Sequence, residues 1–348
     1  MKNKIKLFWL IIIIFVLQGC DGKATEKQTQ SGLLTKKLFY QDDLTKLTGL
    51  VKGDFGTHLG KNIGVIDQFS LSIIDYNSNS LIEKICFDDC KTSILDPSIV
   101  FGVINKPFAI LSKGPSDCRW LDENGYTKWR YHPLKDEFPN AMTVGDLDNN
   151  GIPEFYLATN FGVYKVGIDG NDQWKMVNDE VYRIETLINN AGSRIVALIN
   201  YKNQFQLRDY QGNVVSEFIL PFRIYDFELV NWPKDTNILT YSKNNIYVLD
   251  LNGSVFLEYR LEKTIYDIKG APVRFYEKDR PCLSVIADYS SSIGKSMLLV
   301  FSAKGDLIYK EMIKSTMGIL PYKPKNGTKE VLLVGSGPGE VYEYRSVQ

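Results

Sequence analysis

Short turns that end in glycine recur along this chain, and most of them have the form Asp-x-x-Gly. They occupy residues 121–125, 166–170, 208–212, 249–253 and 301–305, with a weaker copy at 74–78 and a truncated one that begins at 344. Successive copies begin 41 to 52 residues apart, and each lies between two β-rich runs. A repeat of about 40 to 50 residues is typical of supersecondary units that bury their hydrophobic faces only by stacking on one another.

Seven such units predict an all-β, seven-bladed β-propeller. Asn-Gly and Asp-Gly tolerate the positive φ of a two-residue hairpin turn, so each turn is expected to join the third and fourth strands of a blade. Large apolar residues stand four positions past the glycine, with Ser216 as the exception, and we expect them to pack between blades: Ile82, Trp129, Trp174, Leu257 and Tyr309. Eight blades stay possible, but the sequence offers no further unit.

The two ends of the chain predict how the ring closes. Residues 34–40 are strand-like but have no place in the first blade, which can be built from residues 46–52, 62–66, 71–76 and 81–87. The last unit ends at Gln348 without a fourth strand. The N-terminal strand is therefore expected to complete the last blade, which also hides sheet edges that would otherwise pair with other chains. The propeller would span residues 34–348.

The first residues have the pattern of a secretory signal. Three lysines, Lys2, Lys4 and Lys6, precede an unbroken apolar run at 7–17. The run is shorter than the about 20 residues that a spanning helix needs. Its end, Leu17-Gln18-Gly19-Cys20, resembles the lipobox of bacterial lipoproteins. That resemblance implies a signal peptide at 1–19, and a lipidated flexible tether at 20–33 that begins with the acceptor Cys20.

Lipidation implies a membrane-anchored protein of the cell envelope. Several acyl chains, palmitate among them, hold a protein permanently at about 0.8 kcal/mol per buried CH₂. In a Gram-negative host the propeller would face the periplasm. Asp21 resembles an inner-membrane retention signal, but the choice between inner and outer membrane stays open.

Charge excludes one class of partner. The chain carries 41 basic and 41 acidic residues, and loss of the first 20 residues removes three lysines and no acid. The mature protein therefore has three more acidic than basic residues. Nucleic-acid binding needs a basic face, so we expect no nucleic-acid partner.

Cysteines and histidines are few. Cys86 and Cys90 flank a short acidic segment and are candidates for a small disulfide loop, provided that the backbone turns enough to bring their Cα atoms within about 7 Å. Cys118 and Cys282 are interpreted as buried small hydrophobic residues. The two histidines, His58 and His132, lie in no known catalytic or metal motif and are interpreted as surface or capping residues.

The segment from Asp146 to Glu154 has the spacing of a calcium loop. Asp146, Asp148, Asn150 and Glu154 offer side-chain oxygens, Ile152 offers its carbonyl, and Gly151 provides the turn; Ca²⁺ takes six to eight oxygen ligands. Residues 144–159 resemble the FG-GAP or VCBS repeat, which implies calcium bound between the first two strands of one blade. Asn150 in place of aspartate removes a charge and should weaken binding. The alternative is an acidic surface hairpin that binds no ion.

A second resemblance concerns function. The turns that end in Trp129 and Trp174 resemble PQQ-like propeller repeats, which occur in quinoprotein dehydrogenases and in a lipoprotein of the outer-membrane assembly machine. The chain has no vicinal cysteine pair, and we assign no catalytic residue. The sequence favours a protein- or glycan-binding scaffold anchored through Cys20. The alternative is an envelope enzyme, a hydrolase, lyase or quinoprotein-like protein, and carboxylates, arginines and a histidine converging at the channel mouth would favour it.

Overall fold

The computed structural model describes residues 33–347 except 43–46, 57–61, 92, 102–105, 132–136, 178, 190–191, 200–201, 276–279, 291–294, 315–317, 326, 328 and 338. The side chains of 172–174, 176–177, 188–189, 192–194, 196–199 and 290 are also left undescribed. The signal peptide, Cys20, His58 and His132 lie outside the described residues. None of the helices described is long and apolar enough to cross a membrane.

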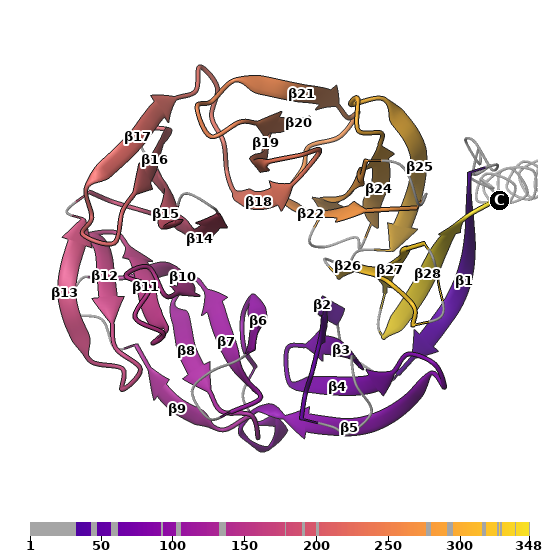
Figure 1. The fold of residues 1–348 in the computed structure, drawn as a ribbon, viewed down its shortest axis with the longest axis horizontal. Coiled ribbons are helices and arrows are strands. Elements are labelled where there is room, and N and C mark those ends of the chain that lie inside the picture. Colours follow the sequence, from indigo (N-terminus) through magenta and orange to yellow (C-terminus); the bar gives the residue numbers. More distant parts are fainter. Residues whose placement is uncertain are drawn as a thin grey trace, which may run out of the picture. The chain divides into compact units, whose positions relative to one another are not determined.

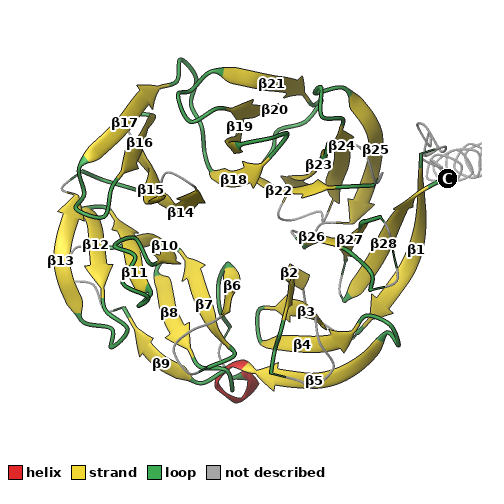
Figure 2. Cartoon of the chain, in the orientation of Figure 1, coloured by secondary structure: helices red, strands yellow, loops and turns green. Residues whose placement is uncertain are grey.

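The described strands form seven antiparallel sheets of four strands each, arranged around a ring (Figures 1 and 2). Six sheets hold four consecutive strands each, and from the innermost strand outwards they are blade 1, β2 (Leu47–Gly53), β3 (Asn62–Asp67), β4 (Ser70–Asp75), β5 (Ser80–Cys86); blade 2, β6 (Pro97–Phe101), β7 (Phe108–Gly114), β8 (Asp117–Leu121), β9 (Thr127–Arg130); blade 3, β10 (Pro139–Gly145), β11 (Glu154–Thr159), β12 (Gly162–Val166), β13 (Asp172–Val177); blade 4, β14 (Arg183–Asn189), β15 (Gly192–Ile199), β16 (Gln204–Arg208), β17 (Val214–Ile219); blade 5, β18 (Phe227–Asn231), β19 (Thr236–Ser242), β20 (Asn245–Leu249), β21 (Val255–Arg260); blade 6, β22 (Asp267–Val273), β23 (Cys282–Ser290), β24 (Lys295–Phe301), β25 (Leu307–Lys314). The all-β propeller is confirmed, and the seven sheets follow the sequence repeat.

Blade 7 combines the two ends of the described chain. It contains β26 (Ile319–Tyr322), β27 (Val331–Ser336) and β28 (Glu340–Ser346), and β1 (Leu34–Gln41) pairs antiparallel with β28 as its outermost strand. The predicted closure by the N-terminal strand is therefore confirmed. The glycine-rich segment 335–339 is the hairpin between β27 and β28, as expected.

The hydrophobic core lies between the blades. Among the described residues, the buried hydrophobic side chains fall into seven clusters, and neighbouring blades share each of them. The second strand of a blade faces both neighbours because successive side chains in a strand point to opposite faces. On β23, for example, Val285 and Ala287 belong to the cluster with blade 5, while Ile286 belongs to the cluster with blade 7.

The repeated turns form as the sequence predicts in place, but not in length. The glycine has positive φ, and its amide donates to the carbonyl three residues earlier, as in Gly253 to Asp250. The Asp250 carboxylate also accepts the amides of Asn252 and Ser254. A strand register shift follows each such turn. The expected two-residue turn is therefore wrong, because the glycine follows a type I turn and forms a bulge.

Each turn glycine packs on the outer strand of the preceding blade. A Cβ added to Gly170 of blade 3 would lie 2.7 Å from Cγ of Trp129 in blade 2. Trp129 also packs edge-on against Phe155 of blade 3, with ring centroids 5.0 Å apart. Its predicted packing role is confirmed, whereas the side chain of Trp174 lies outside the described residues. Ile82, Leu257 and Tyr309 likewise lie in clusters between blades.

The exceptional unit with Ser216 uses a different side chain for the same contact. A Cβ added to Gly253 of blade 5 would lie 2.5 Å from the ring of Phe218 in blade 4. Phe218 stands two residues further along β17, on the same face of the strand as Ser216. The bulky contact is therefore kept although the repeat position is polar.

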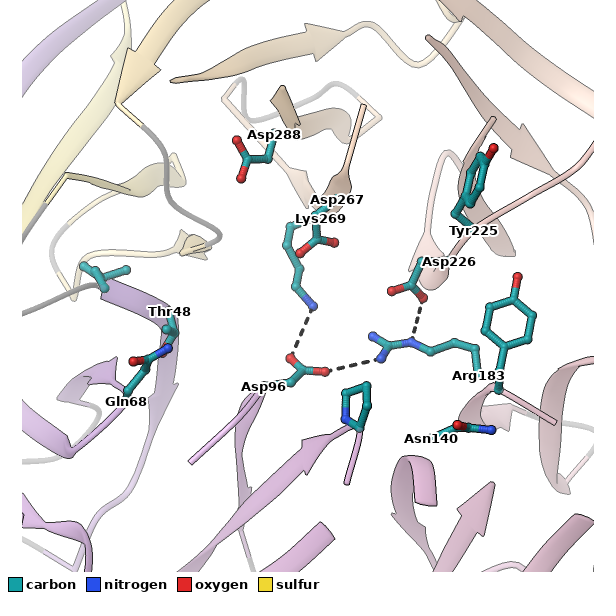
Figure 3. Close-up of a pocket in the computed structure, with 13 residues that line it drawn as sticks. Thr48, Gln68, Asp96, Asn140, Arg183, Tyr225, Asp226, Asp267, Lys269 and Asp288 are labelled. Atoms are coloured by element: carbon teal, nitrogen blue, oxygen red, sulfur yellow. Dashed lines mark hydrogen bonds and ion pairs between the residues drawn. The ribbon is translucent and has the colours of Figure 1, made fainter. Parts of the chain in front are cut away.

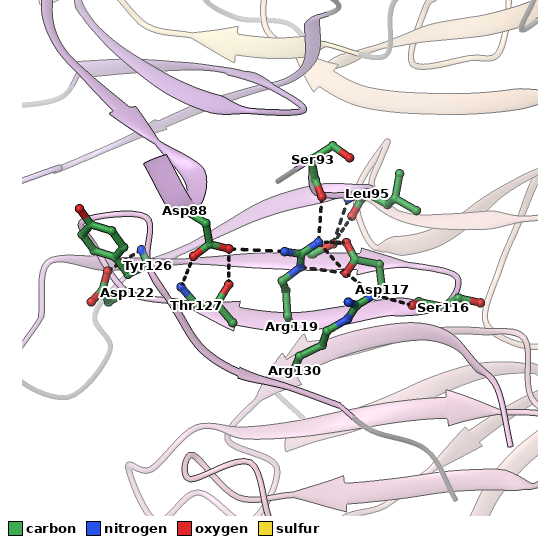
Figure 4. A network of polar contacts seen from close by, with 11 residues as sticks. Asp88, Ser93, Leu95, Ser116, Asp117, Arg119, Asp122, Tyr126, Thr127 and Arg130 are labelled. Carbon is green, nitrogen blue, oxygen red and sulfur yellow. Dashed lines mark hydrogen bonds and ion pairs between the residues drawn. The ribbon is translucent and has the colours of Figure 1, made fainter. Parts of the chain in front are cut away.

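A tight turn joins blades 1 and 2. It is η1 (Phe87–Cys90), and Asp88, Asp89 and Cys90 all have positive φ in it. The Asp88 carboxylate accepts the amide and the hydroxyl of Thr127 at 2.9 and 2.7 Å and lies 3.6 Å from Arg119, whose guanidinium also pairs with Asp117 (Figure 4). One aspartate in left-handed backbone thus ties two blades together.

A disulfide holds this turn. Cys86 and Cys90 are bonded, with their Cα atoms 4.7 Å apart, so the predicted small loop is present. The other interpretation also holds, because Cys118 and Cys282 are both buried.

Two glycines with nearly the same backbone allow a test of packing between blades. Gly170 and Gly151 have φ of 83° and 84°, but only the added Cβ of Gly170 would meet a neighbour. Gly151→Ala should lower the free energy of unfolding by about 1–2 kcal/mol, the cost of left-handed backbone. Gly170→Ala should cost about 1–3 kcal/mol more because it overpacks Trp129. Urea unfolding in EDTA measures both, and equal losses would contradict the packing role.

Candidate functional site

A cavity of about 400 Å³ opens at the end of the central channel where the innermost strands begin (Figure 3). The turns between second and third strands contribute to the same end, since Gln68 and Pro115 also line it. The Asp-x-x-Gly turns and the predicted calcium loop follow the ends of third and first strands, so they lie at the opposite end of the channel. The size is in the range of small-molecule pockets.

The cavity receives a polar residue from each of five blades. Each stands at the start of an innermost strand or directly before it: Asp96 for β6, Asn140 for β10, Arg183 for β14, Asp226 for β18 and Asp267 for β22. Because the blades repeat around the ring, equivalent positions converge on its axis.

A short local pattern positions four of these side chains. An apolar residue stands two positions earlier and is buried between blades: Ile94, Val181, Ile224 and Ile265. The intervening residue is leucine or tyrosine, and Tyr182 and Tyr225 also line the cavity. The buried residue anchors the chain, and the next residue but one then points into the channel because side chains alternate in extended backbone.

Charges of both signs meet in the channel (Figure 3). Arg183 Nε lies 2.7 Å from Asp226 Oδ1, and its Nη1 lies 3.4 Å from Asp96 Oδ2. Lys269 Nζ lies 2.8 Å from Glu228 Oε1 and 3.9 Å from Asp96 Oδ1. The Nε–Oδ1 contact is close but not aligned as a hydrogen bond, and this buried Nε has no hydrogen-bond acceptor. The two cations thus each face two carboxylates.

Asp96 occupies an unusual backbone position. Its φ is 44°, and Pro97 follows it. A non-glycine residue before proline disfavours the helical regions of φ and ψ, so this conformation is strained. Burial alone would raise the pKa of Asp96, but the charges of Lys269, Lys113 and Arg183 outweigh it and hold that pKa well below its ordinary value. Asp96 is therefore ionised and is the central anion of the network.

Two other carboxyl groups behave in the opposite way. Burial raises the pKa of Asp226 to about 7, despite the nearby charge of Arg183, and the neighbouring Asp267 adds to the rise. Burial also raises the pKa of Asp267 against the opposing charge of Lys269, with Asp96 and Glu228 adding repulsion. The channel mouth therefore holds one permanent anion and two carboxyl groups whose ionisation is costly.

The predicted calcium loop lies where the resemblance places it, between β10 and β11 of blade 3. Carboxylate oxygens of Asp146, Asp148 and Glu154 lie within 4.8 Å of one another. Asn150 donates its side-chain amide to Asp148 and accepts the amide of Ile152, so it braces the loop. Three of the five predicted ligands thus converge through side-chain oxygens that suit a hard cation.

A lysine from the neighbouring strand reaches the same carboxylates. Lys165 of β12 places Nζ 2.5 Å from Glu154 Oε1 and 3.9 Å from Asp148 Oδ2. Glu154 also accepts the hydroxyl of buried Tyr156 at 3.0 Å. The loop therefore carries a positive charge of its own, which any bound cation would have to displace.

Sequence reasoning missed the channel-mouth residues. Their signal is the recurrence of Val181-Tyr182-Arg183, Ile224-Tyr225-Asp226 and Ile265-Tyr266-Asp267 one blade apart. The residues that were singled out do not meet there, because the calcium loop is at the other end of the channel. Cys20, His58 and His132 lie outside the described residues.

Comparisons with known proteins bear on the fold. No family model and no curated protein matches the chain. Among solved structures, BBS1N in complex with ARL6DN is similar with a TM-score of 0.59 and 12% identity, over 92% of this chain and 98% of that one. Virginiamycin B lyase from Staphylococcus aureus is similar with a TM-score of 0.56 and 11% identity, over 90% of this chain and 99% of that one. A streptogramin B lyase has a TM-score of 0.55 and 12% identity, over 90% and 98%. At these identities the likeness establishes a β-propeller and nothing finer.

The raised pKa of Asp226 makes a prediction about stability. Between its ordinary pKa of 3.8 and about 7, the folded protein holds a proton on Asp226 that the unfolded chain has lost. The stabilisation from this group is fully present below about pH 4 and is lost as the pH rises through 7. The melting temperature of the wild type relative to Asp226→Asn should therefore fall from pH 5 to pH 8. A constant difference would contradict the raised pKa, and Glu83→Gln on exposed β5 is the control.

Proposed function

We propose that this protein is a lipid-anchored binding module of the bacterial cell envelope, with its recognition site at the channel mouth. The observation that supports this best is the convergence of polar and charged side chains from five blades on one open cavity. A rigid ring positions such groups without cost at the moment of binding, and pre-organisation of this kind increases affinity. The partner is a protein or a glycan that inserts a polar group into the cavity.

Aromatic side chains beside the charges support this function. Tyr225 lines the cavity with 40% of its surface exposed, and its ring stacks on Tyr241 at 5.8 Å between centroids. Exposed tyrosines held by packing offer contact area to protein and sugar partners at low entropic cost. Neither the charge network nor Tyr225 contributes to the hydrophobic clusters between blades, so binding explains their placement better than folding does.

The anchor belongs to the same proposal. Lipidation at Cys20 would keep the module at a membrane surface, facing the periplasm in a Gram-negative host. Residues 20–33 would then be a tether that lets the propeller reach partners near that membrane.

Capture from crosslinked cells tests both parts. Tagged full-length protein should fractionate with membranes and co-purify a specific partner, while Cys20→Ala should leave the membrane fraction and resist labelling by a fatty-acid probe. Asp267→Asn with Tyr225→Ala should stay on the membrane but lose most of the partner, because each removes a group at the cavity. Quantitative mass spectrometry and glycan analysis of the eluates provide the measurement.

A matched control removes the same kinds of group elsewhere. Glu83→Gln lies on the exposed outer strand β5, and Tyr210→Ala lies on the turn between β16 and β17 at the other end of the channel. This double variant should keep the partner. Equal loss from control and channel variants, or full retention by the channel variant, would refute the channel-mouth site, and lipid labelling of Cys20→Ala would refute the anchor.

One observation favours a second function, an enzyme with its site at the same mouth. A general acid or base works best with a pKa near the ambient pH, and the pKa of Asp226 is about 7, beside Arg183. Two of the structures with a similar fold are described as lyases. Recovery of a captured small ligand unchanged after incubation with wild-type protein favours binding. Conversion by the wild type but not by Asp226→Asn would favour the enzyme.

We further propose that the loop of blade 3 binds Ca²⁺ through Asp146, Asp148 and Glu154, with Asn150 and the carbonyl of Ile152 completing the shell. The ion would brace the turn rather than take part in chemistry. Asn150 contributes no charge, and Lys165 competes for the carboxylates, so binding should be weak.

The competing lysine provides a sharp test of this site. Millimolar Ca²⁺ should raise the melting temperature of the wild type, by the stabilisation that a ligand specific to the folded state gives. Asp146→Ala with Asp148→Ala should abolish the rise, and Lys165→Gln should enlarge it because no ammonium then opposes the ion. Scanning calorimetry with Mg²⁺ as the control ion measures this. The same rise in all three proteins would contradict the site.

A further inference from the structure

The charges at the channel mouth do not balance. Four carboxylates line the cavity, those of Asp96, Asp226, Asp267 and Asp288, against the two cations Arg183 and Lys269. Both cations are already engaged, Arg183 by Asp96 and Asp226, and Lys269 by Asp96 and by Glu228 behind it. The cavity therefore has an excess of negative charge that the neighbouring cations leave uncompensated.

The excess is concentrated on blade 6. Asp267 and Asp288 are direct cross-strand partners on β22 and β23, and both side chains face the cavity (Figure 3). Like charges placed directly opposite each other in a sheet are destabilising. Ser296 donates to Asp288 at 3.3 Å, and the amide of Ile268 donates to Asp267 at 2.7 Å. Within the described part of the chain, no lysine or arginine nitrogen is placed within ion-pair distance of Asp267.

Desolvation increases the cost of this arrangement. The pKa of Asp267 is raised by burial and by the charges of Asp96 and Glu228, so its ionised form lacks stabilisation in the free protein. A buried carboxylate without a cationic partner is among the more costly features of a folded chain. A positively charged group entering the cavity would relieve that cost, and this relief would contribute to its affinity.

The geometry suits an ammonium group better than a metal ion. Across the described residues, the acidic cluster with three converging metal-ligand atoms is the loop of Asp146, Asp148 and Glu154, and the channel carboxylates form no such group. An ammonium has three N–H donors that can point to separated acceptors, whereas Ca²⁺ and Mg²⁺ need a compact oxygen shell. A cavity of about 400 Å³ also leaves room for the body of an organic ligand.

We propose that the channel mouth binds a protonated primary amine, with the ammonium held by Asp267 and Asp288 and the rest of the ligand lying toward Asp226 and Tyr225. This inference rests on the proposed binding function and specifies the chemistry that it recognises. The amine belongs either to an amino sugar of a glycan or to a lysine side chain or N-terminus of a protein. Arg183 and Lys269 hold the other carboxylates in place and repel a second cation.

Two matched pairs of probes test the proposal and distinguish the sources. Glucosamine is compared with N-acetylglucosamine, and Nα-acetyl-lysine amide with its Nε-acetylated form, by titration calorimetry on the full propeller. The free amine of at least one pair should bind about tenfold more tightly than its acetylated partner, because hydrogen bonds to charged groups contribute about 1.5–3 kcal/mol. Asp267→Asn should abolish that preference, and Glu83→Gln should leave it unchanged.

The outcomes separate this inference from the function on which it rests. If acetylated and free probes bind equally, or neither amine binds, the amine specificity is refuted, even where the channel variants still lose their partner in cells. Equal competition by millimolar Ca²⁺ or Mg²⁺ would likewise refute it in favour of a metal. If the channel variants keep their partner, the binding function itself fails. Asp288→Asn is the second variant, and circular dichroism with unchanged melting confirms that each variant is folded.

Discussion

The pairing of β1 with β28 is the constraint on which the rest of the structure depends. Each hydrophobic cluster is shared by two blades, so a ring with one gap would expose the apolar faces of both blades at the opening. The closure is strengthened by an aromatic series in which Phe39 of β1 stacks on Tyr76 of blade 1 at 5.1 Å, and Tyr76 packs on Tyr322 of blade 7 at 4.2 Å. The hydroxyl of Tyr76 donates to Glu343 of β28. Hydrogen bonds and apolar packing thus join the two ends of the propeller at one place.

A closed ring determines what can happen at its axis. The innermost strands cannot move apart without breaking clusters between blades, so the residues that precede them stay at fixed positions. This rigidity is what allows Asp96 to keep strained backbone and allows Asp226, Asp267 and Asp288 to remain close despite their mutual repulsion. Such local costs are tolerated where the surrounding structure over-determines the conformation, and they gather at functional sites. The energy that stabilises the mouth comes from the seven clusters between blades, far from the charges themselves.

The sequence predicted the frame well because its signals are local and periodic. Glycine-ended turns, alternating strands and an unpaired first strand each follow from short-range chemistry, and blade 1 matches its expected strands to within about one residue. The turn length was wrong because a strand register shift, which forms the bulge, depends on pairing with the neighbouring strand. The charged site was missed because Asp96, Arg183 and Asp267 are single residues far apart in the chain, which only the closed ring brings together. Lys165 escaped notice for the same reason, since its approach to Glu154 follows from the pairing of β11 with β12.

The two ends of the channel deal with negative charge in different ways. At the loop of blade 3, Lys165 lies against Glu154 and Asp148, so the carboxylates already have a cation from their own blade. At the mouth, the cations from blades 4 and 6 are engaged by Asp96, Asp226 and Glu228, and the pair on blade 6 is left with donors that carry no charge. Asp96 could have been placed elsewhere without strain, yet it lies between Arg183 and Lys269 and neutralises both. The arrangement removes positive charge from the cavity and leaves negative charge in it, which is the electrostatic condition for selecting a cation.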